Sequence, residues 1–182
     1  MPSPVRFDQH AQPHFLLIGW LSAYCAATPG VQPGGDNATV RLDLENDAQP
    51  DALLRLETEQ GGRSQVALDG YLEGPPELVI EIAASSVSYD LHVKRRVYAR
   101  SGVPEYLAVQ MREQRVDWFI LREGVYDTLK PNENGVLRSE VFPGLWLQPA
   151  AIWSADLAAL LAVLQQGLAS PEHTAFAARL AG

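Results

Sequence analysis

Two acidic residues interrupt the most apolar segment of the chain. Glu77 and Glu81 lie within residues 77–83, a run that predicts a strand and follows the breakers Gly74-Pro75-Pro76. Alternate strand residues share a face, so both acids lie opposite the aliphatic residues at 78, 80 and 82. On an edge strand the acids would simply face water. The apolar composition instead predicts an interior strand, where an acid needs a cation or a hydrogen-bond donor. The two acids are about 13 Å apart along the strand, so at most one binds a given ion directly.

A lysine and an aspartate project from the apolar side of the helix predicted for residues 88–100. On a helical wheel at about 100° per residue, Asp90 and Lys94 fall near the middle of the apolar face. Arg95, Arg96 and Arg100 fall on the opposite half, which is typical of a solvated surface. We therefore expect Lys94 to point towards the sheet. The alternative is an intrahelical Asp90–Lys94 pair, worth only a few tenths of a kcal/mol, with Lys94 reaching past its neighbours to water.

A third acid, Asp51, follows Pro50 and directly precedes the apolar residues 52–56, which predict another strand. Aspartate after proline is also common in turns, so Asp51 alone would carry little weight. A carboxylate at one strand start, Glu81 on a core strand and an inward Lys94 together resemble a site for a hard cation. Oxygen ligands suit Mg²⁺, which activates water and neutralises phosphate charge, while the ammonium group steadies the nucleophile or the transition state.

The remaining pattern predicts the elements that position these residues. Strands, a crossover helix and further strands predict an α/β fold with a mixed sheet flanked by helices, in one domain over residues 1–182. Residues 39–44 predict a strand beside 52–56. The other predicted elements are an N-terminal helix at about 13–28, a core at about 38–148 with strands at 106–109, 116–121 and 125–129, and C-terminal helices at about 149–180.

Composition limits the functions that this chain can have. A net charge of −8 argues against salt-sensitive binding along nucleic acid backbones, but not against chemistry assisted by a bound cation. The single cysteine, Cys25, excludes an internal disulfide framework and favours a reducing, cytoplasmic setting. The apolar run at 15–27 lacks a basic leader and is too short to span a bilayer, so it predicts a buried first helix and no membrane association.

Several short segments, taken in order, resemble one protein family. They are Pro50-Asp51, PELVIEIAASS at 76–86, Tyr89-Asp90, Lys94, Tyr98, SGVPEY at 101–106 and VFPGLWL at 141–147. This series is similar to the Uma-type putative restriction endonuclease family of bacteria, within the PD-(D/E)xK nuclease superfamily. The resemblance extends over most of the chain from about residue 14.

The resemblance implies a restriction-endonuclease-like fold and Mg²⁺- or Mn²⁺-dependent hydrolysis of DNA phosphodiester bonds. Asp51 matches the aspartate of the PD element and Glu81 the acid of the second element, so both would hold the metal, with the carbonyl of Ile82 as a further ligand. The chain departs from the superfamily pattern at Ala83, where a lysine is usual. Lys94 is the expected replacement and would position the attacking water.

Two further acids have supporting roles in this interpretation. Many members of the family carry aspartate at the position of Glu77, which is expected either to replace one of the metal-binding acids or to hold them in place. Asp90 is expected to orient Lys94. The three outer arginines are expected to be solvated rather than to contact DNA.

Other functions stay open from the sequence. Because the usual lysine is absent and the chain is acidic, the main alternative is a catalytically inactive nuclease fold used for binding DNA or protein. A small-ligand or protein-interaction domain is a third class, with no motif in its favour. A homodimer is expected for an enzyme that cuts two strands.

Overall fold

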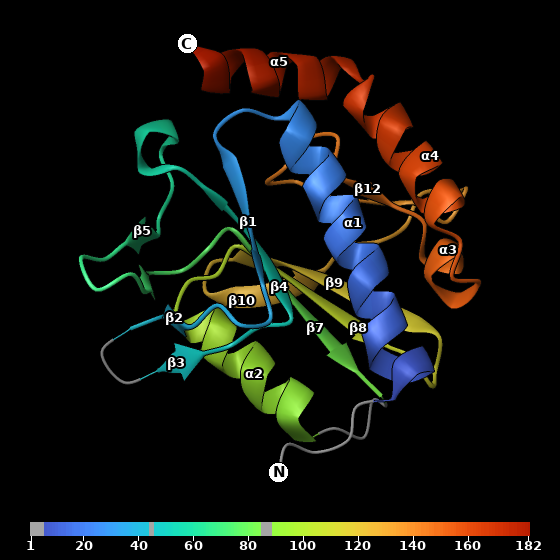
Figure 1. Cartoon of the computed structure of the whole chain (residues 1–182), viewed down its shortest axis with the longest axis horizontal. Coiled ribbons are helices and arrows are strands. Elements are labelled where there is room, and N and C mark those ends of the chain that lie inside the picture. Colours follow the sequence, from blue (N-terminus) through green and yellow to red (C-terminus); the bar gives the residue numbers. More distant parts are fainter. Residues whose placement is uncertain (1–5, 44–45, 85–88) are drawn as a thin grey trace.

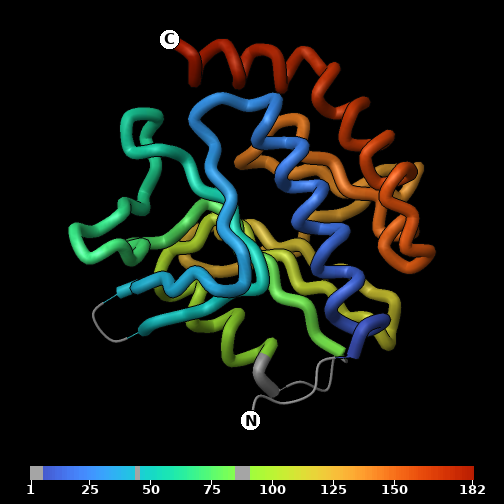
Figure 2. The backbone as a smooth tube through the Cα atoms, in the orientation of Figure 1, coloured from blue at the N-terminus to red at the C-terminus, as the bar shows by residue number. Residues whose placement is uncertain are grey.

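The computed structural model describes residues 6–43, 46–84 and 89–182, without the side chains of residues 89 and 90 (Figures 1 and 2). The helical elements are η1 (Phe7–Ala11), α1 (Gln12–Ala27), η2 (Thr58–Gln60), α2 (Tyr89–Arg100), α3 (Pro149–Trp153), α4 (Leu157–Leu168) and α5 (Pro171–Ala181). The strands are β1 (Val31–Gly35), β2 (Val40–Arg41), β3 (Asp47–Ala48), β4 (Ala52–Leu56), β5 (Gln65–Val66), β6 (Leu72–Glu73), β7 (Leu78–Ala83), β8 (Glu105–Gln110), β9 (Arg115–Arg122), β10 (Val125–Thr128), β11 (Leu137–Arg138) and β12 (Trp146–Leu147).

The main sheet has six strands in the order β1-β4-β7-β8-β9-β10. Strands β7 and β8 run parallel, because α2 carries the chain from one to the other, and the remaining neighbours are antiparallel. The prediction that residues 77–83 form an interior strand is confirmed, since β7 has a neighbour on each side. The α/β fold class is confirmed as well: a mixed sheet lies between helices.

Helices cover the two faces of the sheet, and the alternation along β7 decides which residues meet them. Leu78, Ile80 and Ile82 join the larger core cluster, to which α1, α4 and α5 contribute. Val79, on the other face, packs in a second cluster with Tyr98 of α2. The predicted buried first helix is confirmed by its fully buried inner residues, Leu17, Trp20, Leu21 and Tyr24. Figure 2 shows the C-terminal segment lying along the outer side of α1.

The elements around the candidate residues agree closely with the sequence predictions. Strand β4 has the predicted bounds, and α2 covers residues 89–100 of the predicted 88–100. Helix α2 ends where Gly102 adopts φ +81°, a conformation that glycine adopts without strain. The amide of Val103 then donates to the carbonyl of Tyr98 and closes the last turn. The strands predicted after this helix are β8, β9 and β10, and β9 and β10 form the predicted hairpin.

One sequence prediction about the sheet was wrong, and one strand was not predicted. Residues 40–41 do not pair with β4: they form β2 of a small four-stranded sheet, in the order β3-β2-β6-β5. The place beside β4 belongs to β1, which contains Pro33 and two glycines and was not predicted from the sequence. Proline is tolerated there because β1 is an edge strand. Residues 44 and 45, the end of the predicted strand, lie outside the described residues.

The C-terminal helices predicted at about 149–180 are α3, α4 and α5. Trp153 ends α3 and Leu157 begins α4, whose first turn is capped by the Asp156 carboxylate accepting from the Ala159 amide at 2.9 Å. No helix among the described residues is long and apolar enough to cross a membrane. The assignment of the whole chain to one domain stays a prediction.

Candidate active site

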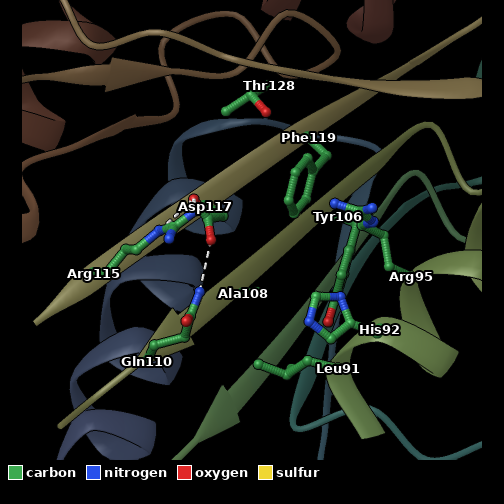
Figure 3. Close-up of a pocket in the computed structure, with 10 residues that line it drawn as sticks. All are labelled: Leu91, His92, Arg95, Tyr106, Ala108, Gln110, Arg115, Asp117, Phe119 and Thr128. Carbon is green, nitrogen blue, oxygen red and sulfur yellow. Dashed lines mark hydrogen bonds and ion pairs between the residues drawn. The ribbon is translucent and has the colours of Figure 1, made fainter. Parts of the chain in front are cut away.

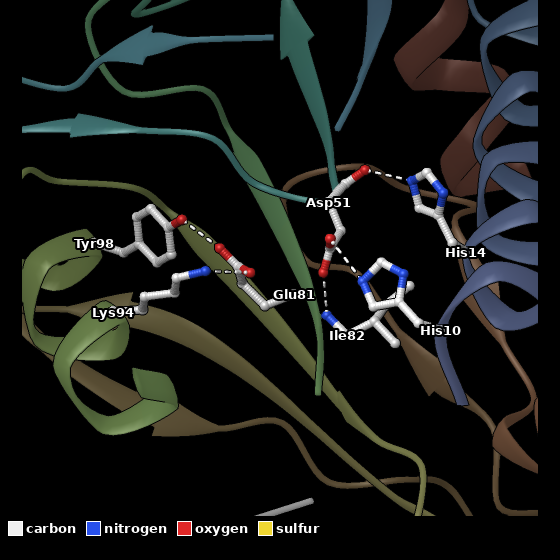
Figure 4. A network of polar contacts seen from close by, with 7 residues as sticks. All are labelled: His10, His14, Asp51, Glu81, Ile82, Lys94 and Tyr98. Atoms are coloured by element: carbon white, nitrogen blue, oxygen red, sulfur yellow. Dashed lines mark hydrogen bonds and ion pairs between the residues drawn. The ribbon is translucent and has the colours of Figure 1, made fainter. Parts of the chain in front are cut away.

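The Glu81 carboxylate is held between the sheet and α2 (Figure 4). Its side chain leaves the face of β7 that α2 covers and is 4% exposed. Lys94 Nζ lies 2.8 Å from Oε2, and the Tyr98 hydroxyl donates to Oε1 at 2.6 Å. Lys94 and Tyr98 are four residues apart and so occupy successive turns of the same helix face. The inward lysine predicted from the helical wheel is therefore present, and its partner is Glu81.

Burial and nearby charges act in opposite directions on Glu81. Removal from water raises the pKa of its carboxyl group, and the negative charge of Asp51 raises it further. The charge and hydrogen bond of Lys94 and the Tyr98 hydroxyl lower the pKa, but less than burial raises it. Burial and the Glu81 charge together also raise the pKa of the Tyr98 hydroxyl, so this hydroxyl stays a donor. Glu81 is consequently a stronger base than an ordinary glutamate.

Asp51 lies directly before β4, at the end of that strand next to Ile82 of β7. Its Oδ2 accepts a hydrogen bond of 2.6 Å from the Ile82 amide, and its Oδ1 lies 3.1 Å from His10 Nε2. The Asp51 carbonyl oxygen lies 2.7 Å from His14 Nε2, which fits a donor N–H at that nitrogen. The N-terminal helical segment thus fixes both the side chain and the backbone of Asp51 (Figure 4).

The two carboxylates are neighbours that point apart. Asp51 bonds to the amide of the residue that follows Glu81, and its charge acts on the Glu81 pKa. Figure 4 shows Glu81 turned towards α2 and Asp51 turned towards His10. In the described part of the chain, no group of three or more His, Cys, Asp or Glu could hold a metal ion. The two carboxylates nevertheless fit Mg²⁺ by donor chemistry, because this ion is commonly bound by one or two carboxylates, with waters and substrate phosphates completing its shell.

The other candidate residues lie elsewhere. Glu77 accepts from the backbone amides of Leu56 at 2.7 Å and Arg63 at 2.9 Å, and so joins β7 to the segment after β4 rather than reaching Glu81. The side chain of Asp90 lies outside the described residues. Arg96 and Arg100 are exposed on α2, as predicted, whereas the exposed Arg95 turns back over the sheet and places its guanidinium 5.2 Å from the centre of the Phe119 ring.

A third buried glutamate, Glu105, is completely enclosed on the other face of the sheet. Its Oε1 accepts from the amides of Glu140 and Val141, and its Oε2 accepts from Trp118 Nε1 and the Ser139 hydroxyl. Burial raises its pKa to about 7, and the four donors act against that rise. Glu105 therefore attaches the segment at residues 139–141 to the start of β8.

The contacts of two histidines and of the Tyr98 hydroxyl were not predicted from the sequence. His10 and His14 are four residues apart, a spacing that places both on one side of a helix and could have indicated a shared partner. That the partner is Asp51, about 40 positions away, follows only from the fold. The Tyr98 ring packs in the second core cluster, as an apolar residue would, but its hydroxyl bonds to Glu81.

A mixed sheet flanked by helices in this arrangement places the chain among the restriction-endonuclease-like α/β folds. The crystal structure of a putative nuclease belonging to DUF820 from Anabaena variabilis ATCC 29413 has a similar fold, with a TM-score of 0.63. The match covers 85% of this chain and 84% of that chain at 10% sequence identity, so it supports the fold alone. The chain belongs to the Uma2 family, described as "Putative restriction endonuclease", whose match extends over residues 1–150. A comparison with curated proteins found no match.

Proposed function

We propose that the chain is a metal-dependent nuclease that hydrolyses DNA phosphodiester bonds, with Asp51, Glu81 and Lys94 as its catalytic residues. The observation that supports this most directly is the 2.8 Å contact between Lys94 Nζ and Glu81 Oε2. The contact brings to the second acid the lysine that Ala83 does not provide. Membership of a family described as putative restriction endonucleases supports the same class of reaction.

Asp51 and Glu81 would hold Mg²⁺ or Mn²⁺, with the carbonyl of Ile82 as a further oxygen donor. Such an ion neutralises phosphate charge and lowers the pKa of a water molecule. The Ile82 amide and His10 hold one Asp51 carboxylate oxygen each, so Asp51 would have to turn from His10 to share an ion with Glu81. His10 is a positioning residue for Asp51 in the present arrangement.

Lys94 and Glu81 are able to exchange their present partners for substrate. The side chain of Lys94 is 33% exposed, so its ammonium group can turn from Glu81 to a phosphate oxygen or to the attacking water. Oε2 of Glu81, once released by Lys94, would then be available to the metal ion. Tyr98 continues to donate to Oε1 and keeps the carboxylate in place.

Cleavage of plasmid and oligonucleotide DNA tests this proposal. With Mg²⁺ or Mn²⁺ we expect the wild-type protein to cut, and Glu81→Ala and Lys94→Ala to lose at least about 100-fold in rate. Arg96→Ala is the matched control, because Arg96 is exposed on the same helix and is expected to keep the wild-type rate. Equal residual cleavage by wild type and both site variants would indicate a contaminating nuclease and would contradict the proposal.

A catalytically inactive binding module is the second candidate. The observation in its favour is that all four carboxylate oxygens of Asp51 and Glu81 already have partners within the chain. This module would bind DNA without cutting it, and its affinity would not respond to Mg²⁺. Light scattering with and without a duplex would test the expected homodimer in either case. A cytoplasmic location stays a prediction.

A further inference from the structure

A pocket of about 320 Å³ opens beside α2, on the sheet face that carries Glu81 (Figure 3). The strand registers fix its position, because Glu81 of β7 pairs with Ala108 of β8, and Ala108 pairs with Asp117 of β9. Ala108 and Asp117 both line the pocket. Neighbouring strands are about 4.8 Å apart, so the pocket begins one strand from Glu81 and extends three strands, to Thr128 of β10, about 14 Å from it.

Helix α2 contributes side chains both to the Glu81 site and to the pocket. Lys94 turns to Glu81, whereas Leu91 and Arg95 line the pocket. A strand of nucleic acid whose phosphate contacts Lys94 would therefore have the adjoining nucleoside beside the pocket entrance. The distance from Glu81 to the pocket is one that a single nucleotide bridges.

The lining of the pocket suits a planar, polar ring. Ala108 leaves space at the floor that a larger side chain would fill, and Phe119, which is 7% exposed and stacks on Tyr106, forms the wall next to it. The Arg95 guanidinium lies 5.2 Å from the centre of the Phe119 ring, so a cation and an aromatic face meet at the pocket wall. Nucleobases stack on guanidinium planes as well as on aromatic rings, and Arg95 is the exposed one of these two residues.

Hydrogen-bonding groups gather at the other side of the pocket. Gln110, which is 5% exposed, donates to Asp117 Oδ2 at 2.6 Å, and Arg115 binds Asp117 Oδ1. Amide, carboxylate and guanidinium groups are those that recognise base edges. Two arginines and His92 line the pocket against the single acid Asp117, in a chain whose net charge is −8. This local excess of basic groups favours a ligand with a phosphate.

We propose that this pocket binds a nucleobase of the strand being cut, next to the phosphate at Glu81 and Lys94. This inference rests on the proposed nuclease function and narrows its substrate to strands with an unstacked base: single-stranded DNA, or a duplex with a mismatch or a flipped nucleotide. A base inside a regular duplex cannot enter, because it is covered by its neighbours in the stack.

An abasic scan of a labelled single strand tests the pocket by binding, separately from cleavage. Fluorescence anisotropy of the full chain, with Ca²⁺ in place of Mg²⁺, would compare a 12-nucleotide strand with versions that each lack one base. For wild type we expect about a tenfold loss of affinity at one position and little change at the others. Arg95→Ala is expected to weaken binding of the intact strand about tenfold and to remove the difference between the intact and abasic strands.

Arg96→Ala is the matched control, since Arg96 is exposed on α2 but does not line the pocket. It is expected to stay within about twofold of wild type and to keep the abasic difference. A flat abasic scan in wild type, or equal losses for Arg95→Ala and Arg96→Ala, would overturn the pocket assignment.

Titration with the four deoxynucleoside monophosphates separates the two proposals. We expect them to shift the amide NMR signals of Gln110, Asp117 and Phe119 in wild type, and to shift them less in Gln110→Ala. Such shifts in a protein that cuts no DNA would support the pocket and contradict the nuclease. Cleavage without these shifts, together with a flat abasic scan, would overturn the pocket and leave the nuclease standing.

Discussion

Glu81 and Glu105 lie on neighbouring strands, are both buried, and both have pKa values raised by burial, yet their surroundings differ in kind. Glu105 is bound by two backbone amides, a buried indole and a serine hydroxyl. Glu81 is bound by a lysine that is one-third exposed and by a tyrosine hydroxyl. The donors of Glu105 cannot leave without breaking the fold, whereas Lys94 can. Burial of an acid therefore does not mark a catalytic site by itself, but burial beside a partner that can be exchanged does.

The largest expected effect is on the rate of cleavage. Glu81→Gln should lower the rate at least about 100-fold, while the free energy of unfolding stays within about 1 kcal/mol of wild type. Stability changes little because Lys94 can turn to water and one buried charge is removed. Glu77→Gln is the control directly before the same strand, and its folded fraction should cut at the wild-type rate. Comparable rate losses in both variants would contradict the claim that Glu81 acts in cleavage and Glu77 does not.

Glu105→Gln should have the opposite effect: a lower free energy of unfolding and an unchanged cleavage rate. The amide NH₂ group would face donors that now bind a carboxylate oxygen, so we expect a loss of about 3 kcal/mol in the free energy of unfolding. The cleavage rate per folded molecule should be unchanged. Denaturant unfolding measures the first quantity, with Glu140→Gln as a surface control, because the Glu140–Arg122 pair is about half exposed. A stable Glu105→Gln protein without activity would move the catalytic site to Glu105.

The pH dependence of the free energy of unfolding should also reflect the raised pKa of Glu105. Its pKa in the folded protein is about 7, above the ordinary 4.5, so the folded protein binds more protons than the unfolded chain between these values. The free energy of unfolding should therefore fall as the pH rises from about 4.5 to about 7. Glu105→Gln should reduce this slope, and Glu140→Gln should leave it unchanged. A wild-type stability that increases over this interval, with the same slope in Glu105→Gln, would contradict the assignment.

The smallest expected effect concerns the Tyr98 hydroxyl. Tyr98→Phe removes a hydrogen bond that lowers the Glu81 pKa, so the acidic limb of the cleavage pH profile should move to higher pH. The free energy of unfolding should fall by about 1 kcal/mol. Tyr126→Phe is the matched control, because it also loses one hydrogen bond, to the carbonyl of Val103, without contacting Glu81. If both variants keep the wild-type pH profile, the hydroxyl does not act on Glu81.

Local pattern predicted much of this arrangement. Alternation along residues 77–83 gave the face of Glu81, and helical periodicity gave the inward direction of Lys94, because both follow from the repeat of one element. The contact of His10 with Asp51 and the different roles of the three glutamates depend on how distant segments meet. Strand β1 was missed for a related reason, since its place beside β4 outweighed the turn propensity of Pro33 and two glycines.

Paramagnetic Mn²⁺ tests most directly whether Asp51 and Glu81 form a metal site. In ¹H–¹⁵N NMR spectra we expect Mn²⁺ at substoichiometric amounts to broaden the amide signals of Asp51, Glu81 and Ile82 first, and Glu81→Gln to weaken that broadening at least tenfold. The signals of Glu105 and Glu140, on the other face of the sheet, should broaden later. Broadening centred elsewhere, or unchanged by Glu81→Gln, would contradict the account.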